Sequence, residues 1–132
     1  MKISIIGISN ITKIIINKIE NHCKSITIFN IDNDFDFTNE YKNKKNIKII
    51  LIQDYFENLD SITSESDYIF ILTDKDFNNS LLFHKIKLTL ELGKIQFLIK
   101  DNYLFEMYKN KKYSVINESS IEENDLINII RS

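Results

Sequence analysis

The residues best suited to bind a ligand stand directly after short apolar runs in this sequence. Gly7 to Ile11 follow the first run, and polar or charged residues follow four later runs. A glycine turn exposes backbone N–H groups to a phosphate, and polar side chains beside it can hydrogen-bond a ribose or a base. The pattern therefore indicates nucleotide binding. The candidate residues are Gly7, Ile8, Ser9, Asn10, Ile11, Asn30, Asp32, Asp54, Thr73, Asp74 and Lys100.

Each candidate has an expected role. The helix that follows Gly7 would direct its first N–H groups and its positive dipole end at a phosphate. The polar residues after the second run would meet a ribose, and Asp54 would flank the base. Thr73 and Asp74 would lie over the middle of the ligand, and Lys100 would supply positive charge. Structural roles remain open for the same residues, since glycine suits any sharp turn and Asp, Asn and Thr cap helices.

Six apolar runs are expected to form strands, and helical patterns lie between them. Most of the runs are continuous rather than alternating, which is typical of parallel strands covered on both faces. Strands alternating with helices predict an α/β fold with a doubly wound, Rossmann-like parallel sheet, as one domain over residues 1–132. The carboxyl ends of the strands meet at one edge of such a sheet, where ligands bind. The expected strands are 2–6, 26–29, 47–52, 68–72, 95–99 and 113–116.

Two helical segments carry more apolar residues than one sheet can cover. Residues 81–92 read as a helix that is apolar almost all round and ends at Gly93, a residue type that often caps helices. Residues 121–131 read as a terminal helix, with Ser119 and Glu122 at capping-box spacing. We therefore expect a homodimer or higher homo-oligomer that uses one of these two helices.

The stretch DYIFILTDKDFNNSLL, at 67–82, resembles the nucleotide-binding TrkA-N domain, the N-terminal lobe of RCK domains. The similarity lies in a T-D-x-D-x-x-N pattern at Thr73, Asp74, Asp76 and Asn79. The segments IILIQD and QFLIKDNYLFEMYKNKKYSVIN resemble the same family, so the likeness covers nearly the whole chain. It implies a cytoplasmic, non-catalytic regulatory subunit that pairs with itself and binds NAD(H) or an adenine nucleotide. It also implies a membrane potassium transporter as partner, at the inner face of the membrane, and no C-terminal ligand lobe is expected here.

The sequence departs from the family pattern at several ligand positions. A glycine loop of the G-x-G-x-x-G type would have glycines where Ser9 and Thr12 stand, and a serine there intrudes on the path of a pyrophosphate. Asn30 stands in place of a ribose-binding acid, and Lys100 in place of an arginine with its bidentate fork. We expect weakened binding, in the high micromolar to millimolar range.

Two further classes of function stay open. One is a Rossmann scaffold that binds nothing and acts only by dimerisation. The other is a piece of an NAD-dependent dehydrogenase, because MKISIIG also resembles the start of malate and lactate dehydrogenases. That class needs a substrate domain with a His–Asp pair, and neither His22 nor His84 has a suitable companion.

Composition argues against nucleic-acid binding, disulfides, metal sites and membrane insertion. The net charge of -2 gives no support to a nucleic-acid partner. Cys23 is the single cysteine, so no disulfide forms within the chain, and its neighbour His22 and the distant His84 lack companion metal ligands. No signal peptide or membrane-spanning run is recognised, which predicts a cytoplasmic protein.

Overall fold

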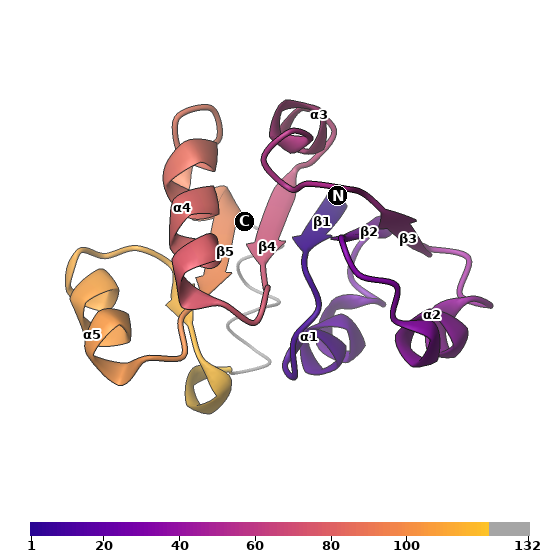
Figure 1. Cartoon of the computed structure of the whole chain (residues 1–132), viewed down its shortest axis with the longest axis horizontal. Coiled ribbons are helices and arrows are strands. Elements are labelled where there is room, and N and C mark those ends of the chain that lie inside the picture. The colour runs from indigo at the N-terminus through magenta and orange to yellow at the C-terminus, as the bar shows by residue number, and fades with distance from the viewer. Residues whose placement is uncertain (122–132) are drawn as a thin grey trace.

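A computed structural model describes residues 1–121 of the chain as one α/β domain around a six-stranded, all-parallel sheet (Figure 1). The strand order is β3-β2-β1-β4-β5-β6. The strands are β1 (Lys2–Ile6), β2 (Ser25–Asn30), β3 (Ile47–Leu51), β4 (Tyr68–Ile71), β5 (Ile95–Leu98) and β6 (Val115–Ile116). The prediction of a doubly wound, Rossmann-like parallel sheet is confirmed, because β2 and β4 both pair with β1 and the order reverses beside it.

Helices cover both faces of the sheet. On one face, α1 (Thr12–Ile19) and α2 (Phe35–Tyr41) pack against apolar side chains of β1 and β2. On the other face, α3 (Leu59–Ser64), α4 (Asp76–Ile86) and α5 (Asn102–Asn110) pack against β4 and β5. Two short 3-10 turns, η1 (Leu92–Lys94) and η2 (Glu118–Ser120), complete the described elements.

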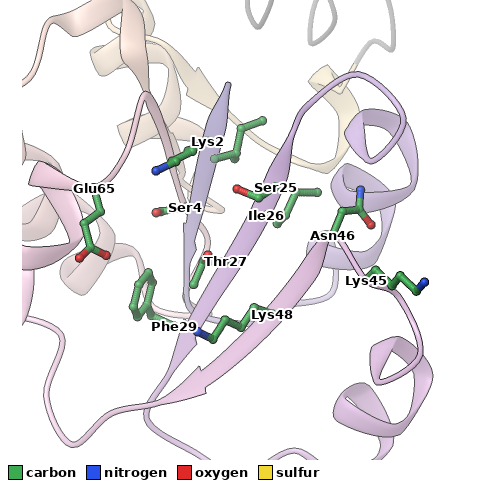
Figure 2. Close-up of a pocket in the computed structure, with 11 residues that line it drawn as sticks. Lys2, Ser4, Ser25, Ile26, Thr27, Phe29, Lys45, Asn46, Lys48 and Glu65 are labelled. Atoms are coloured by element: carbon green, nitrogen blue, oxygen red, sulfur yellow. The ribbon is translucent and has the colours of Figure 1, made fainter.

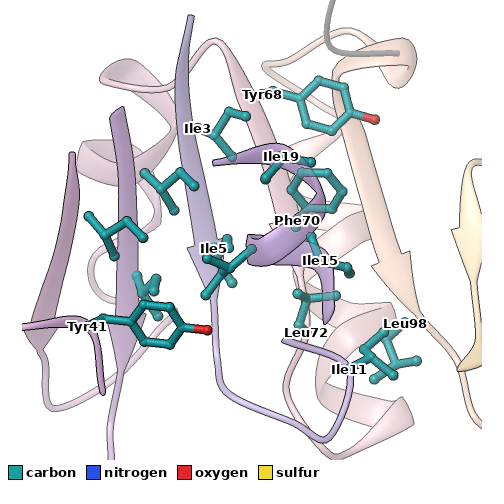
Figure 3. Packing of buried hydrophobic residues seen from close by; sticks show 14 of the residues in the cluster. Ile3, Ile5, Ile11, Ile15, Ile19, Tyr41, Tyr68, Phe70, Leu72 and Leu98 are labelled. Atoms are coloured by element: carbon teal, nitrogen blue, oxygen red, sulfur yellow. The ribbon is translucent and has the colours of Figure 1, made fainter. Parts of the chain in front are cut away.

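The central strands are mainly apolar because they are buried on both sides. Figure 3 shows Ile3 and Ile5 of β1 directed at Ile15 and Ile19 of α1, which are all almost fully buried. Ile6, the residue after Ile5, belongs to the core on the opposite face. This two-sided burial accounts for the continuous apolar runs in the sequence.

The prediction of a helix over 81–92 is wrong at both ends. Helix α4 begins at Asp76 and ends at Ile86, where the Ile86 carbonyl accepts hydrogen bonds from the N–H groups of Thr89 and Leu90 and from Thr89 Oγ1. The Thr89 bond spans three residues, as does the bond from the Leu88 N–H to the Lys85 carbonyl, so the last turn tightens into a 3-10-like turn where α4 ends. Gly93 lies in η1 and does not cap α4. Leu88, expected on the helix, is 79% exposed beyond its end.

Two further expectations concern the end of the chain and the membrane. The predicted terminal helix 121–131, with its Ser119–Glu122 capping box, lies outside the described residues. Within residues 1–121, no helix has the length and apolar character required to cross a membrane.

Candidate functional site

The turn after β1 lies at the centre of the predicted site. Gly7 has a φ of +87°, a conformation that residues with a side chain rarely adopt. Its N–H donates to the Phe29 carbonyl at 2.8 Å. A Cβ atom on Gly7 would lie 2.6 Å from Thr73 Cγ2 and 2.7 Å from Thr73 Cα. Gly7 is therefore required by the close approach of the β4–α4 turn, whether or not a ligand binds there.

The two residues that replace the loop glycines bind one another. The Ser9 N–H donates to Thr12 Oγ1 at 2.9 Å, and the Thr12 N–H donates to the Ser9 carbonyl at 3.2 Å. Thr12 is fully buried in the first turn of α1. The backbone N–H of Ser9, at the position of the second loop glycine, thus already has an acceptor within the loop.

A carboxylate lies at the tip of the same loop. Asn10 Nδ2 donates to Glu118 Oε1, which belongs to the short turn η2 after β6. This bond brings a negative charge to the start of α1, where the helix dipole favours anions. Glu118 thus places a carboxylate beside the loop, although it lines the separate cavity next to Lys100.

The residue expected to bind ribose is engaged inside the protein. Asn30 is buried, its Nδ2 donates to the Asp32 carbonyl at 2.5 Å, and its Oδ1 accepts from Tyr55 Oη at 3.0 Å. An amide has only one acceptor oxygen, and here Tyr55 uses it. Burial raises the pKa of Tyr55 to about 12, so its hydroxyl stays protonated and continues to donate at neutral pH.

The motif residues behind Thr73 connect the ends of two strands. Asn79 is fully buried, and its Oδ1 accepts from the Thr73 N–H at 3.1 Å and from Thr73 Oγ1 at 2.5 Å. Its Nδ2 donates to the carbonyls of Thr73 and Leu98, each at 2.9 Å. The Asp76 carboxylate accepts from the N–H groups of Lys100 and Asp101 at 2.7 and 2.9 Å. These contacts tie the end of β4 to the end of β5.

The two remaining candidates lie apart from this group. The Asp54 carboxylate accepts from the Phe56 N–H at 2.9 Å and so closes the turn after β3. Lys100 is exposed and borders a separate cavity of about 290 Å³ beside Asn117 and Glu118. Neither side chain lines the cavity that contains Asn30 and Thr73.

Two adjoining cavities lie at the carboxyl edge of the sheet. The first measures about 190 Å³, and the candidates Ile8, Asn30, Asp32, Thr73 and Asp74 line it. The second measures about 440 Å³ and includes the candidates Ile8, Ser9 and Asn10. The structure therefore brings most of the predicted residues to one edge, as the fold requires. Gly7 underlies this edge in the turn against Thr73, and Ile11 is fully buried beside it.

The charges around these cavities are mainly negative. Asp32, Asp34 and Asp74 line the first with Lys75 as the only cation, and Asp34 and Asp36 line the second together with Lys13. Lys13 Nζ forms an ion pair with Glu40 Oε2 at 2.6 Å, which partly neutralises the positive charge of Lys13. A pyrophosphate at this edge would be repelled by the aspartates. Among the described residues, no three His, Cys, Asp or Glu side chains form a group that could hold a metal ion.

Three contributors to the site escaped the sequence analysis. Tyr55, Asp34 and Glu118 come from segments that the motif comparison did not include. Tyr55 follows the candidate Asp54 in the turn after β3. Its place after a strand of the parallel sheet was therefore a signal that it lies at the ligand edge. The contact of Glu118 with Asn10 had no such signal, because it depends on how the chain returns after β6.

A separate hollow of about 420 Å³ lies on the sheet face over the beginnings of β1, β2 and β3 (Figure 2). Ser4, Thr27 and Lys48 project into it from the three strands. It opens at the opposite end of the strands from the predicted ligand edge, so it contributes nothing to that site.

Comparison with known proteins adds no relative: no family model matches the chain, and no curated protein matches it either.

Proposed function

We propose that this chain is a non-catalytic regulatory domain that acts through self-association, on a Rossmann-like scaffold whose dinucleotide site is closed. The observation that carries the proposal is the hydrogen bond from the Ser9 N–H to Thr12 Oγ1. It engages the loop N–H at the position of the second glycine, and it does so with a buried hydroxyl that the first turn of α1 holds in place.

The ribose position supports the same proposal. Both polar atoms of the buried Asn30 side chain already have a partner within the protein, which leaves one lone pair and one N–H for a ribose, and a ribose that needed more would have to displace Tyr55 or the Asp32 carbonyl. Breaking such a bond leaves a buried polar group unsatisfied, at a cost of about 1–3 kcal/mol. The aspartates around the two cavities add electrostatic repulsion toward phosphates.

The absence of catalysis is part of the proposal. His84 has a polar neighbour within the protein: its Nε2 lies 3.4 Å from Tyr108 Oη, on the α4–α5 side of the sheet. It does not line the cavities at the Gly7 edge. A dehydrogenase would require an acid–base pair beside the nicotinamide, and the residues that line these two cavities include no histidine.

The second candidate is a nucleotide sensor for a potassium transport system, as the resemblance to TrkA-N domains implies. Its support is the preserved Gly7 turn and the N–H groups of Asn10 and Ile11, which make no hydrogen bond to any residue within 1–121. These groups lie at the start of α1 and would suit a phosphate if Glu118 moved away. The partner would then be a membrane transporter subunit that responds to the paired domains.

Calorimetric titration with NAD⁺, NADH, ATP and ADP separates the two candidates. The closed-site proposal predicts no measurable heat of binding up to about 1 mM ligand, together with a dimer in sedimentation equilibrium at micromolar concentration. Binding of any of these nucleotides with a dissociation constant below about 100 µM would overturn the proposal and favour the sensor. A monomeric chain across the same range would overturn it as well.

A further inference from the structure

We propose that the free edge of β3 is the surface through which two copies of this chain associate, as an antiparallel strand pair on a twofold axis. The inference rests on the proposed function, which requires self-association, and it names the surface. Strand β3 is the last strand of the sheet on its side, and no other described strand pairs with its outer edge.

The backbone of β3 offers hydrogen-bonding groups along this edge. The Ile26 N–H donates to the Asn46 carbonyl, and the Ile52 N–H donates to the Asn30 carbonyl, each at 2.8 Å. Because alternate residues of a parallel strand bond to the same neighbour, the even-numbered residues 46–52 face β2. The backbone groups of Ile49 and Leu51 therefore point outward, as does the Ile47 carbonyl.

The side chains of β3 are compatible with a partner at the edge. Leu51 is 60% exposed, which is unusual for a leucine in a strand of this sheet. Lys48, a residue type that often protects sheet edges, projects instead from the sheet face into the hollow beside Phe29 (Figure 2). The edge therefore exposes the apolar side chain of Leu51. The side chain of Lys48 points away from the edge, so it does not block a partner strand.

Charge distribution selects the second copy as the occupant and antiparallel as the direction. Lysines precede and begin the strand at Lys44, Lys45 and Lys48, whereas Asp54 follows its end. A parallel partner with this sequence would place lysines against lysines. An antiparallel copy places the basic beginning of each strand beside the acidic end of the other, which favours self-association.

A twofold axis at Ile49 satisfies both the backbone and the charges. Ile49 then exchanges both backbone hydrogen bonds with Ile49 of the second copy, and Leu51 lies opposite Ile47 of that copy. Lys44 and Asp54 lie in the turns just before and just after β3, so the antiparallel direction brings the Lys44 turn of each copy to the same end of the strand pair as the Asp54 turn of the other. Two sheets joined in this way form one continuous sheet, and the contact closes because each edge is used once.

A cysteine at the axis tests the geometry directly. Opposed residues of a hydrogen-bonded antiparallel pair have Cα atoms about 5.5 Å apart, within the range of about 4.4–6.8 Å that a disulfide spans. In a Cys23→Ser background, Ile49→Cys should form a disulfide-linked dimer on mild oxidation at micromolar concentration. The control is Leu88→Cys, which is exposed on the segment after α4 and should remain uncrosslinked.

Failure of the inference and failure of the proposed function give different results. Crosslinking through Leu88→Cys but not Ile49→Cys, or a sedimenting dimer without crosslinking at Ile49→Cys, would overturn the β3 surface and leave self-association intact. A monomer in sedimentation equilibrium without crosslinking at either position would overturn both.

Charge reversal provides a second test that does not depend on a cysteine within the strand. Lys44→Glu and Asp54→Lys should each weaken dimerisation by about tenfold or more, and the double variant should recover most of the loss. Lys44 also lies 3.5 Å from Glu20 in its own chain, so Glu20→Gln serves as the control and should leave dimerisation unchanged. Additive weakening in the double variant would contradict the register.

Discussion

Gly7 and Thr73 are in direct contact across the β1–β4 boundary, and the contact leaves no room for a side chain on Gly7. A Cβ atom at Gly7 would lie 2.6 Å from Thr73 Cγ2 and 2.8 Å from Thr73 N. The backbone of Thr73 is held in turn by the amide of Asn79, so it cannot withdraw without breaking those bonds. The two most recognisable parts of the nucleotide-binding pattern thus depend on one another for structural reasons.

We expect Gly7→Ala to destabilise the fold by about 2–5 kcal/mol, from the positive φ together with the clash against Thr73. Urea denaturation followed by circular dichroism measures the loss. The matched control is Gly93→Ala, because a Cβ there meets no atom within 4 Å. It should be neutral or stabilise the protein by up to about 1 kcal/mol. Equal effects of the two substitutions would contradict the contact described above.

We expect Asn79→Ala to cost about 2–4 kcal/mol of unfolding free energy, because it leaves the Thr73 N–H and the Leu98 carbonyl without a partner in a buried site. The control is Asn78→Ala at the neighbouring position, since Asn78 is only partly buried and lines the cavity of about 190 Å³. It should change stability by less than about 0.5 kcal/mol. Similar denaturation midpoints for both variants would show that the amide of Asn79 is not the connection between β4 and β5.

Opening the loop should restore nucleotide binding if the Ser9–Thr12 bond is what closes it. The triple variant Ser9→Gly, Thr12→Ala and Asn30→Asp removes the Thr12 hydroxyl and supplies a ribose-binding carboxylate. We expect its affinity for NADH to exceed that of the unaltered chain by at least about tenfold in calorimetry. Ser9→Gly alone keeps the Thr12 hydroxyl and should not bind more tightly.

Stability should fall at alkaline pH through the buried tyrosines. Burial raises the pKa of Tyr55 to about 12 and also raises the pKa of Tyr68, so the folded state favours their protonated forms. Their contribution is complete below the unfolded pKa of about 10 and is lost as pH rises from there through the folded values. The free energy of unfolding should therefore stay level from pH 7 to 9 and decline above pH 10.

Tyr55→Phe tests whether ionisation of Tyr55 contributes to the loss of stability above pH 10. The variant removes one of the groups that must ionise, so its stability should decline less steeply above pH 10 than that of the unaltered chain. Tyr103→Phe is the control, because Tyr103 is 80% exposed and should leave the profile unchanged. Parallel profiles for Tyr55→Phe and the unaltered chain would place the dependence on other groups.

The fold was predictable from sequence because local pattern and global architecture agree in this chain. The apolar runs at 2–6 and 68–72 predict buried parallel strands, and these strands form as β1 over Lys2–Ile6 and β4 over Tyr68–Ile71. The position of the candidate residues along one edge follows from the same rule, since parallel strands bring their carboxyl ends together. The end of α4 was missed because Leu88 and Leu92 extend the apolar pattern past Ile86, while the backbone there changes to three-residue bonds from Leu88 to Lys85 and from Thr89 to Ile86.

The state of the site was decided by tertiary structure alone. Residue types at Ser9, Asn30 and Asp76 allow either ligand contact or internal hydrogen bonding, because the same polar atoms serve both purposes. The choice depends on distances that no local pattern specifies, such as that of Tyr55 Oη from Asn30 Oδ1 or of Glu118 from Asn10. Sequence therefore determined where a nucleotide site would lie, and packing determined which of its hydrogen bonds the protein already uses itself.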